Sequence, residues 1–216
     1  PLPKENNPFR AAHQLEGKFV VLYSGNIALT QDLRTVIKAA SLLRHIPDIV
    51  FTIVGEKQAL ERVREYCLMD GADNVKLLPF QPREHLPEML AAADVALVTQ
   101  KHNVIAFNLP SKIPVILASG RPIIASVPAT GTAAKAVHQS GGGLVVTPED
   151  PEALASAIEG LYKNPDKAKM LGQQGRQYAV DYYSFEQALN RYESMFEYLH
   201  SSSKIKAESL AKLGDA

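Results

Sequence analysis

The chain has 216 residues, of which 46% are hydrophobic, and its 23 basic side chains balance 23 acidic ones. This length suits one large domain or at most two, and the charge balance gives no basic surface for nucleic acid. The single cysteine, Cys67, excludes an internal disulfide and a cysteine-based zinc site, and the surrounding ALERVREYCLMD indicates a packed helix residue.

No apolar run approaches the roughly 18 residues that a membrane-spanning helix needs, and no signal peptide is recognisable. We therefore expect a cytoplasmic, reducing location. Peripheral attachment to a membrane surface, through other parts of a longer protein, stays open.

The first residues do not read as the start of a domain. PLPKENNPFRAAHQLEGK has three prolines, two adjacent asparagines and little apolar periodicity. We expect residues 1–16 to be an interdomain linker, with 1–15 poorly anchored, in a chain that is a piece of a longer protein. One domain is expected over 17–200. The polar segment 201–216, SSSKIKAESLAKLGDA, is expected to be a flexible tail.

From Phe19 onward, apolar runs alternate with helical patterns. FVVLYSG is a continuous apolar run that ends in glycine, which is typical of a strand buried on both faces. Strands are expected at 19–25, 49–55, 75–80, 94–100, 121–127 and 143–148, with a helix after each. This alternation predicts an α/β fold with a doubly wound, Rossmann-like, six-stranded and mainly parallel sheet.

Three helices are expected to close the chain, each with a recognisable start. Asp150 and Asn164 both precede a proline, and Ser184 is followed at the third position by Gln187. The last helix, 184–199, has apolar positions that need cover from another part of the protein: Phe185, Leu189, Tyr192, Met195 and Phe196.

The stretch NLPSKIPVILASGRP predicts a short helix over 112–119 at the carboxyl edge of the sheet, where ligands bind in such folds. Ser111 is expected to cap this helix, and the N–H groups of Lys112 and Ile113 to lack intrahelical partners. Lys112 adds a full charge to the positive helix end. We predict an anion site for a phosphate or diphosphate. The alternative is a capped helix with a solvated lysine.

The other loops at this edge give weaker signals. Gly25 and Asn26 follow the first strand, where a backbone without a side chain can approach a ligand. His102 is the one histidine in a suitable loop for chemistry, with a solvated surface histidine as the alternative. Neither G-x-G-x-x-G after the first strand nor a P-loop motif is present, and no Ser/His/Asp arrangement follows from the spacing.

The ordered motifs LYSGN, FTIVGE, VKLLPF, LPSK, LASGRPIIAS and DPEALASAI resemble the C-terminal half of family-four (group 1) glycosyltransferases. These enzymes have the two-domain B-type fold, and the likeness is to the branch found in bacterial polysaccharide and exopolysaccharide clusters. The match covers roughly residues 17–200. It implies that this half binds a nucleotide-sugar donor, that an absent N-terminal half binds the acceptor, and that transfer takes place between them.

The resemblance also implies a retaining hexosyltransferase without a metal or other cofactor. In such an enzyme, this chain alone is expected to bind the donor weakly or not at all and to transfer nothing. The diphosphate would lie at Ser111, Lys112 and the Gly25 turn, the base beside Phe80, and the sugar near the 103–108 loop. The implied substrate-binding residues are Gly25, Asn26, Gly55, Glu56, Phe80, Gln81, Asn103, Pro110, Ser111 and Lys112.

Several family positions differ here. Two glutamates common in the family would fall at Phe107 and Val115, and two basic clamp residues at Asn26 and at Thr30 or Gln31. The sequence therefore does not identify the sugar, the nucleotide, the acceptor or a catalytic residue. The alternatives are a nucleotide-sugar 2-epimerase, which shares the fold, and a non-catalytic sugar-nucleotide binding module.

Overall fold

The structure is a computed structural model that describes residues 1–104 and 109–214, with side chains described up to residue 200. It divides into two compact units, Pro1–Tyr178 and Ala179–Ala216. The first unit contains the sheet. Within the described residues, no helix is long and apolar enough to cross a membrane. The expected domain boundaries at residues 16 and 200 stay predictions.

Six parallel strands form one sheet in the order β3-β2-β1-β4-β5-β6. The six-stranded parallel sheet is therefore confirmed. The inner strands β2, β4 and β5 are buried along their whole length, whereas β3 and β6 at the two edges are mostly half-buried. The strands are β1 (Phe19–Ser24), β2 (Ile49–Gly55), β3 (Val75–Pro79), β4 (Val95–Thr99), β5 (Ile123–Ser126) and β6 (Gly143–Val146).

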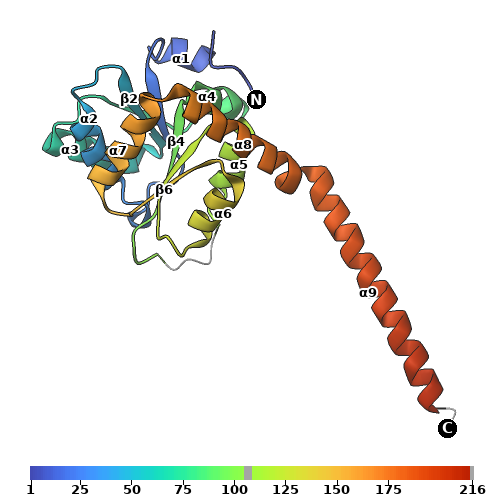
Figure 1. Ribbon diagram of the computed structural model, residues 1–216. Helices are drawn as coiled ribbons and strands as arrows, with labels where there is room; N and C mark the ends of the chain where they lie inside the picture. Colours follow the sequence, from blue (N-terminus) through green and yellow to red (C-terminus); the bar gives the residue numbers. More distant parts are fainter. Residues whose placement is uncertain (105–108, 215–216) are drawn as a thin grey trace. The chain divides into compact units, whose positions relative to one another are not determined.

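Helices cover both faces of the sheet (Figure 1). One face packs against α2 (Leu33–Leu43), α3 (Lys57–Asp70) and α7 (Pro151–Tyr162). The other carries α4 (Leu86–Ala92), α5 (Lys112–Ser119) and α6 (Thr132–Ser140). Two short 3-10 turns precede helices, η1 (Leu29–Gln31) before α2 and η2 (Arg83–His85) before α4. Because side chains alternate along a strand, Leu22 and Tyr23 of β1 point to opposite layers.

The predicted helix starts at the end of the chain are confirmed. The carboxylate of Asp150 accepts a hydrogen bond from the Ala153 N–H at 2.8 Å, and Asn164 Oδ1 accepts one from the Lys167 N–H at 3.0 Å. Ser184 Oγ accepts one from the Gln187 N–H at 3.3 Å. These residues precede α7, α8 (Pro165–Tyr183) and α9 (Phe185–Gly214).

Helix α9 continues well beyond the predicted end at residue 199. Its first turns expose five large apolar side chains, as expected if another part of the protein covers them; that cover stays a prediction. They are Phe185, Leu189, Tyr192, Met195 and Phe196.

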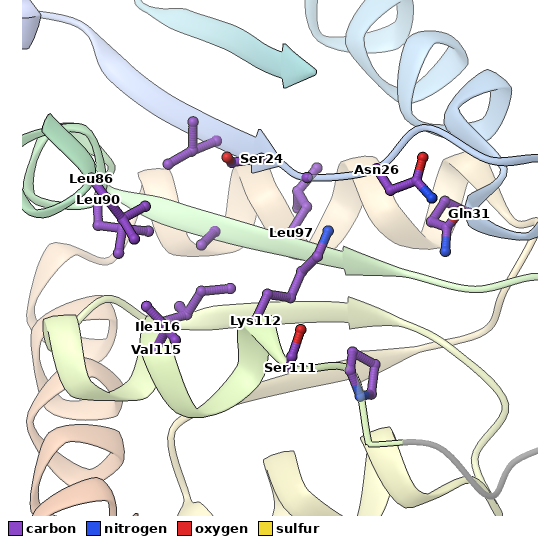
Figure 2. Close-up of a pocket in the computed structure, with 14 residues that line it drawn as sticks. Ser24, Asn26, Gln31, Leu86, Leu90, Leu97, Ser111, Lys112, Val115 and Ile116 are labelled. Carbon is purple, nitrogen blue, oxygen red and sulfur yellow. The ribbon is translucent and has the colours of Figure 1, made fainter. Parts of the chain in front are cut away.

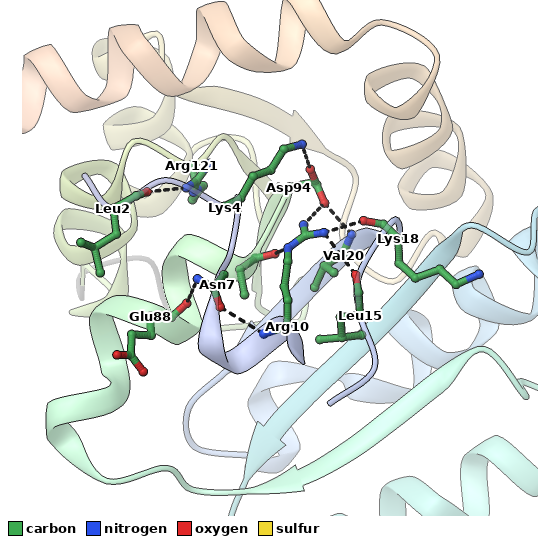
Figure 3. Close-up of polar contacts among 11 residues, drawn as sticks. Leu2, Lys4, Asn7, Arg10, Leu15, Lys18, Val20, Glu88, Asp94 and Arg121 are labelled. Carbon is green, nitrogen blue, oxygen red and sulfur yellow. Dashed lines mark hydrogen bonds and ion pairs between the residues drawn. The ribbon is translucent and has the colours of Figure 1, made fainter. Parts of the chain in front are cut away.

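The expectation that residues 1–15 are poorly anchored is wrong. This segment contains a short helix, α1 (Pro8–Ala12), and buries Phe9, Arg10 and Leu15. Figure 3 shows the Arg10 guanidinium at the centre of a polar cluster. Its Nε donates to the Ala92 carbonyl at 2.9 Å, and Nη1 donates to the carbonyls of Leu15 and Lys18. Arg10 is therefore a buried cation whose hydrogen-bond donors are satisfied, and it helps to hold this segment against the domain.

Asp94 completes this cluster from the start of β4. Its Oδ2 accepts from Arg10 Nη2 at 2.5 Å and from the Val20 N–H at 2.8 Å, while Lys4 Nζ lies 2.8 Å from Oδ1. Asp94 thus links the segment before the sheet to β1. This arrangement could not be predicted from the sequence, because residues so far apart leave no local pattern. Arg10 and Asp94 are separated by 84 positions.

Candidate functional site

A cavity of about 400 Å³ lies on the α4 and α5 side of the sheet, where the strand order reverses. The chain builds β1, β2 and β3 outward in one direction and then returns to place β4 on the other side of β1. In open α/β sheets, such a switch point opens a crevice at the carboxyl ends of the strands. The cavity is lined by Leu22, Ser24, Gly25, Asn26, Gln31, Leu86, Leu90, Ala96, Leu97, Pro110, Ser111, Lys112, Val115 and Ile116.

Lys112 divides this cavity into two chemically different ends (Figure 2). Asn26 and Gln31 lie to one side of it, toward the carboxyl edge of the sheet. On the other side lie the apolar side chains of Leu86, Leu90, Val115 and Ile116 from α4 and α5, and Ser24 at the end of β1 is the polar side chain there.

The Lys112 side chain reaches from the first turn of α5 across Gly25 to the ring of Tyr23. A Cβ atom on Gly25 would lie 2.9 Å from Lys112 Nζ, and Gly25 has a φ of +138°, which side chains disfavour. Burial lowers the pKa of Lys112 to about 8, so that the amine is mostly protonated at neutral pH. Among the described residues, no carboxylate forms an ion pair with this ammonium. Lys112 is thus a partly desolvated cation that an incoming anion can pair with.

Tyr23 fixes the loop that follows β1. Its side chain is fully buried, and its hydroxyl donates to the Asn26 carbonyl at 2.6 Å. The Gly25 N–H donates to the Val54 carbonyl at 3.1 Å. Burial raises the pKa of Tyr23, which therefore stays neutral and offers Lys112 a ring face rather than a phenolate.

Two details of the predicted helix start are wrong. Ser111 occupies the position before the helix, but it is in the right-handed helical region and its side chain makes no capping hydrogen bond. The Ile113 N–H donates to the Pro110 carbonyl at 3.0 Å, so it already has a partner. The Pro110 carbonyl, rather than the Ser111 side chain, therefore accepts a hydrogen bond from the first turn of the helix. Both Pro110 and Ser111 line the cavity beside Lys112. The helix covers the expected residues 112–119 and ends before Gly120, which is in the left-handed conformation.

Gln31 lines the cavity and is held in place by several hydrogen bonds. Its side-chain oxygen accepts from the Ala28 N–H at 3.0 Å and from Thr30 Oγ1 at 3.1 Å. Its backbone carbonyl accepts from Thr99 Oγ1 at 2.5 Å, which ties η1 to β4. Because the amide oxygen is occupied, the amide N–H₂ group is left to donate toward the cavity. The family resemblance had left Thr30 and Gln31 as alternatives, and the structure places Gln31 in the lining.

Half of the predicted substrate-binding residues lie together in this cavity, and half lie outside it. Gly55 serves packing, because a Cβ atom there would lie 2.4 Å from Ile27 Cδ1. Glu56 and Asn103 are exposed, and the side-chain amide of Gln81 donates to the Pro79 carbonyl at 2.8 Å. The residues outside the lining are Gly55, Glu56, Phe80, Gln81 and Asn103, whereas Phe107 falls outside the described residues.

His102 has a partner, but not in the cavity. Its backbone N–H and its ring Nδ1 both contact the carboxylate of Glu149, the first at 3.0 Å. These contacts hold the pKa of Glu149 below its usual value. The imidazole is largely exposed. Among the described residues, no group of three histidine, cysteine or acidic side chains could hold a metal ion.

Proteins with similar sequences carry the names of glycosyltransferases. WcaI of Escherichia coli K12, assigned to colanic acid biosynthesis as a glycosyl transferase, is 35% identical over 144 residues, which cover 66% of this chain and 35% of the relative. WbjE of Pseudomonas aeruginosa, a probable glycosyltransferase, is 28% identical over 159 residues, or 74% of this chain and 40% of the relative. The chain thus spans well under half the length of either.

Solved structures show the same fold at low identity. HepE of Anabaena in complex with UDP superposes with a TM-score of 0.78 at 19% identity, over 93% of this chain and 54% of that one. The C-terminal domain of the group 1 glycosyl transferase LpcC from Francisella tularensis gives a TM-score of 0.70 at 19% identity, over 85% of this chain and 95% of that one. The family model for group 1 glycosyl transferases matches residues 5–178. This chain therefore belongs to the group 1 glycosyl transferases.

Proposed function

We propose that this chain is the donor-binding domain of a retaining glycosyltransferase that transfers a hexose from a nucleotide-sugar during bacterial polysaccharide or exopolysaccharide synthesis. One observation carries the proposal: Lys112 places an ammonium at the β1/β4 switch point of a group 1 glycosyl transferase, without an acidic partner among the described residues. The relatives WcaI and WbjE support the reaction class, and HepE has been solved with UDP.

The proposed reaction develops negative charge that the site must stabilise. When the glycosidic bond to the donor breaks, negative charge grows on the leaving diphosphate, and fixed donors near that charge lower the barrier. Lys112 supplies the cation, and the Gln31 amide supplies a neutral donor held in place by Ala28 and Thr30. The proposal assigns no resident cofactor, since the nucleotide-sugar is a substrate.

The proposed partner is an N-terminal acceptor-binding domain of the same protein. The longer relatives support this idea, as do the exposed apolar side chains along the first turns of α9. We further propose a cytoplasmic protein that reaches its acceptor at a membrane surface, with Cys67 as the free thiol of a reducing compartment.

The two alternatives differ in their support. Epimerase chemistry calls for acidic and histidine groups around the sugar, and within the described lining of the cavity neither type occurs. The family model also favours a transferase. A non-catalytic binding module would share the cavity but form no product, so that product detection separates it from the transferase.

Two measurements on nucleotide-sugars test the proposal. Calorimetric titration of the full-length parent protein with UDP-, GDP-, ADP- and CDP-sugars should show binding of at least one. The full-length parent protein should then transfer that sugar to an acceptor, and Lys112→Ala should reduce both effects. If the full-length protein binds a nucleotide-sugar but forms no product, a binding module is left. If the full-length protein binds none of them, donor recognition is refuted.

A further inference from the structure

The amine of Lys112 is poorly solvated and yet lines an open cavity. Among the lining residues that the structure describes, Lys112 is the one ionisable side chain. Its ammonium lies over the ring of Tyr23, and the ion pairs found among the described residues do not include it. A ring face, unlike a carboxylate, has no net charge with which to hold the proton. Lys112 therefore loses its proton more easily than a lysine in water.

A lysine is a nucleophile only when its amine is neutral. With its pKa lowered to about 8, about a quarter of the Lys112 amines are neutral at about pH 7.5, whereas an ordinary lysine is neutral in about one molecule in a thousand. A less basic amine is also a weaker nucleophile, as is known for thiols, so the gain in rate is smaller than the gain in neutral amine. We expect Lys112 to react roughly tenfold faster than an exposed lysine.

The neighbours of Lys112 select the kind of electrophile. Asn26 and Gln31 carry side-chain amides on one side of the amine, and Ser111 has a hydroxyl that caps no helix (Figure 2). Because these donors are uncharged, they can bind a phosphate whether or not Lys112 carries its proton. An acyl phosphate is a carboxylic acid joined to phosphate. With its phosphate on these donors, it presents its carbonyl carbon to an amine that is already close.

We infer that Lys112 is a site of Nε-acylation by acyl phosphates, and that this modification blocks the donor site. The lone pair of Nζ forms a bond to the carbonyl carbon, the bond from that carbon to the phosphate oxygen breaks, and inorganic phosphate leaves with the electron pair. The amine proton passes to solvent. The product is a neutral amide, which no longer pairs with a diphosphate. The block rests on the proposed donor-binding function, whereas the acylation does not depend on it.

The rate of acylation at each lysine tests the inference. The full-length parent protein is treated with acetyl phosphate at about pH 7.5, and mass spectrometry measures acetylation at every lysine. Lys112 should be acetylated roughly tenfold faster than Lys57. Lys57 is the matched control, because it is also the first residue of a helix after a strand but is exposed and lies outside the cavity lining.

Two comparisons examine the role of the phosphate. The N-hydroxysuccinimide ester of acetic acid has no phosphate, and its preference for Lys112 over Lys57 should be several-fold smaller. Asn26→Asp keeps the shape of the side chain but adds a negative charge to the cavity lining. This charge repels acetyl phosphate and favours the protonated amine, so the preference for Lys112 should be lost while the rate at Lys57 stays the same.

The block is measured on the same samples. Loss of nucleotide binding should follow the extent of acetylation at Lys112, and a bound nucleoside diphosphate should slow acetylation there. Lys112→Arg, which keeps a cation but has no amine to acylate, should retain its remaining affinity after the same treatment. Loss of affinity in this variant would assign the block to another lysine and overturn that part of the inference.

The remaining outcomes separate the inference from the proposed function. Acetylation of Lys112 no faster than that of Lys57, or an equal preference with both reagents, overturns the inference alone if nucleotides still bind. If Lys112 is acetylated rapidly but UDP, GDP, ADP and CDP neither bind nor slow the reaction, the acylation site stands. The proposed donor-binding function then fails, and the block fails with it.

Discussion

The ammonium of Lys112 lies 4.0 Å from the centre of the Tyr23 ring. A cation this close to an aromatic face gains about 0.5–2 kcal/mol, which offsets part of the cost of removing the lysine from water. The position of Tyr23 is itself fixed by packing and a hydrogen bond, since the side chain is buried and its hydroxyl donates to the Asn26 carbonyl. The ring therefore holds the charge over the β1/β4 crevice before any ligand arrives.

Lys112→Ala should weaken nucleoside diphosphate binding by roughly tenfold to a hundredfold, because a charge-assisted contact to phosphate contributes about 1.5–3 kcal/mol. Lys112→Arg should recover only part of the affinity, since the guanidinium is planar and larger than an ammonium. Calorimetric titration measures both. Lys57→Ala is the matched control: Lys57 is exposed, also starts a helix after a strand, and does not line the cavity.

The Lys57 variant distinguishes a specific anion site from a general effect of positive charge. If Lys57→Ala lowers affinity as much as Lys112→Ala does, the effect is one of general charge rather than of a site. Unchanged affinity in Lys112→Ala, with unchanged thermal stability, would mean that the anion binds elsewhere.

Nucleotide affinity should fall as the pH rises above about 8. Burial lowers the pKa of the free Lys112 amine to about 8, and a bound diphosphate would raise it by favouring the charged form. Binding above this pH therefore requires proton uptake, which reduces affinity by up to about tenfold per pH unit. Titrations between roughly pH 7.5 and 9.5 measure the slope. Lys112→Arg should flatten it, because arginine does not titrate there; an equal slope in that variant would assign the pH dependence to another group.

The same pKa shift has a consequence for the stability of the free protein. Because the folded pKa of Lys112 lies below its usual value, the folded state binds fewer protons than the unfolded state between the two values. The penalty of burying the charge is therefore complete below about pH 8 and is relieved as the pH rises further. A bound anion stabilises the folded protein with Lys112 protonated. A rise in pH stabilises the free folded protein with Lys112 neutral.

The fold could be predicted because its signals are local. Apolar runs such as FVVLYSG indicated all six strands, and the side chains of Asp150 and Asn164 indicated the starts of α7 and α8. The position of Lys112 at the start of α5 was also predictable, because a basic residue at a helix start on the carboxyl edge of a sheet has a recognisable pattern. Its role in binding stays a prediction. Each of these features depends on residues within a few positions of one another.

The features missed by sequence reasoning depend on long-range contacts. The burial of Arg10 needs Ala92 and Asp94, and the placement of Gln31 needs Thr99. The apolar wall of the cavity could not be anticipated either. Leu86 and Leu90 read as ordinary core positions of a short helix, and only their approach to Val115 makes them part of a site. No spacing along the chain indicates such a meeting.

Removing the Ser111 hydroxyl should cost little stability. Ser111 makes no capping hydrogen bond, so that Ser111→Ala should change the free energy of unfolding by less than about 0.5 kcal/mol. Asp150→Ala is the matched comparison. Its carboxylate accepts from the Ala153 N–H at the start of α7, and losing such a cap costs about 1 kcal/mol. Urea unfolding of both variants measures the difference, and a loss in Ser111→Ala equal to that in Asp150→Ala would show that the serine caps α5 in solution.

Arg10→Ala should be the most destabilising of these substitutions, at about 3–5 kcal/mol, because it leaves the buried Asp94 carboxylate without its main partner. Lys4→Ala removes the other cation paired with Asp94, but the Lys4 side chain is 47% exposed, so its loss should cost about 0–1 kcal/mol. Arg10→Met, which keeps much of the apolar stem, separates lost charge from lost packing. Urea unfolding of the three variants measures these differences. Equal stability of Arg10→Ala and Lys4→Ala would mean that residues 1–15 are not fastened to the domain, as the sequence alone had indicated.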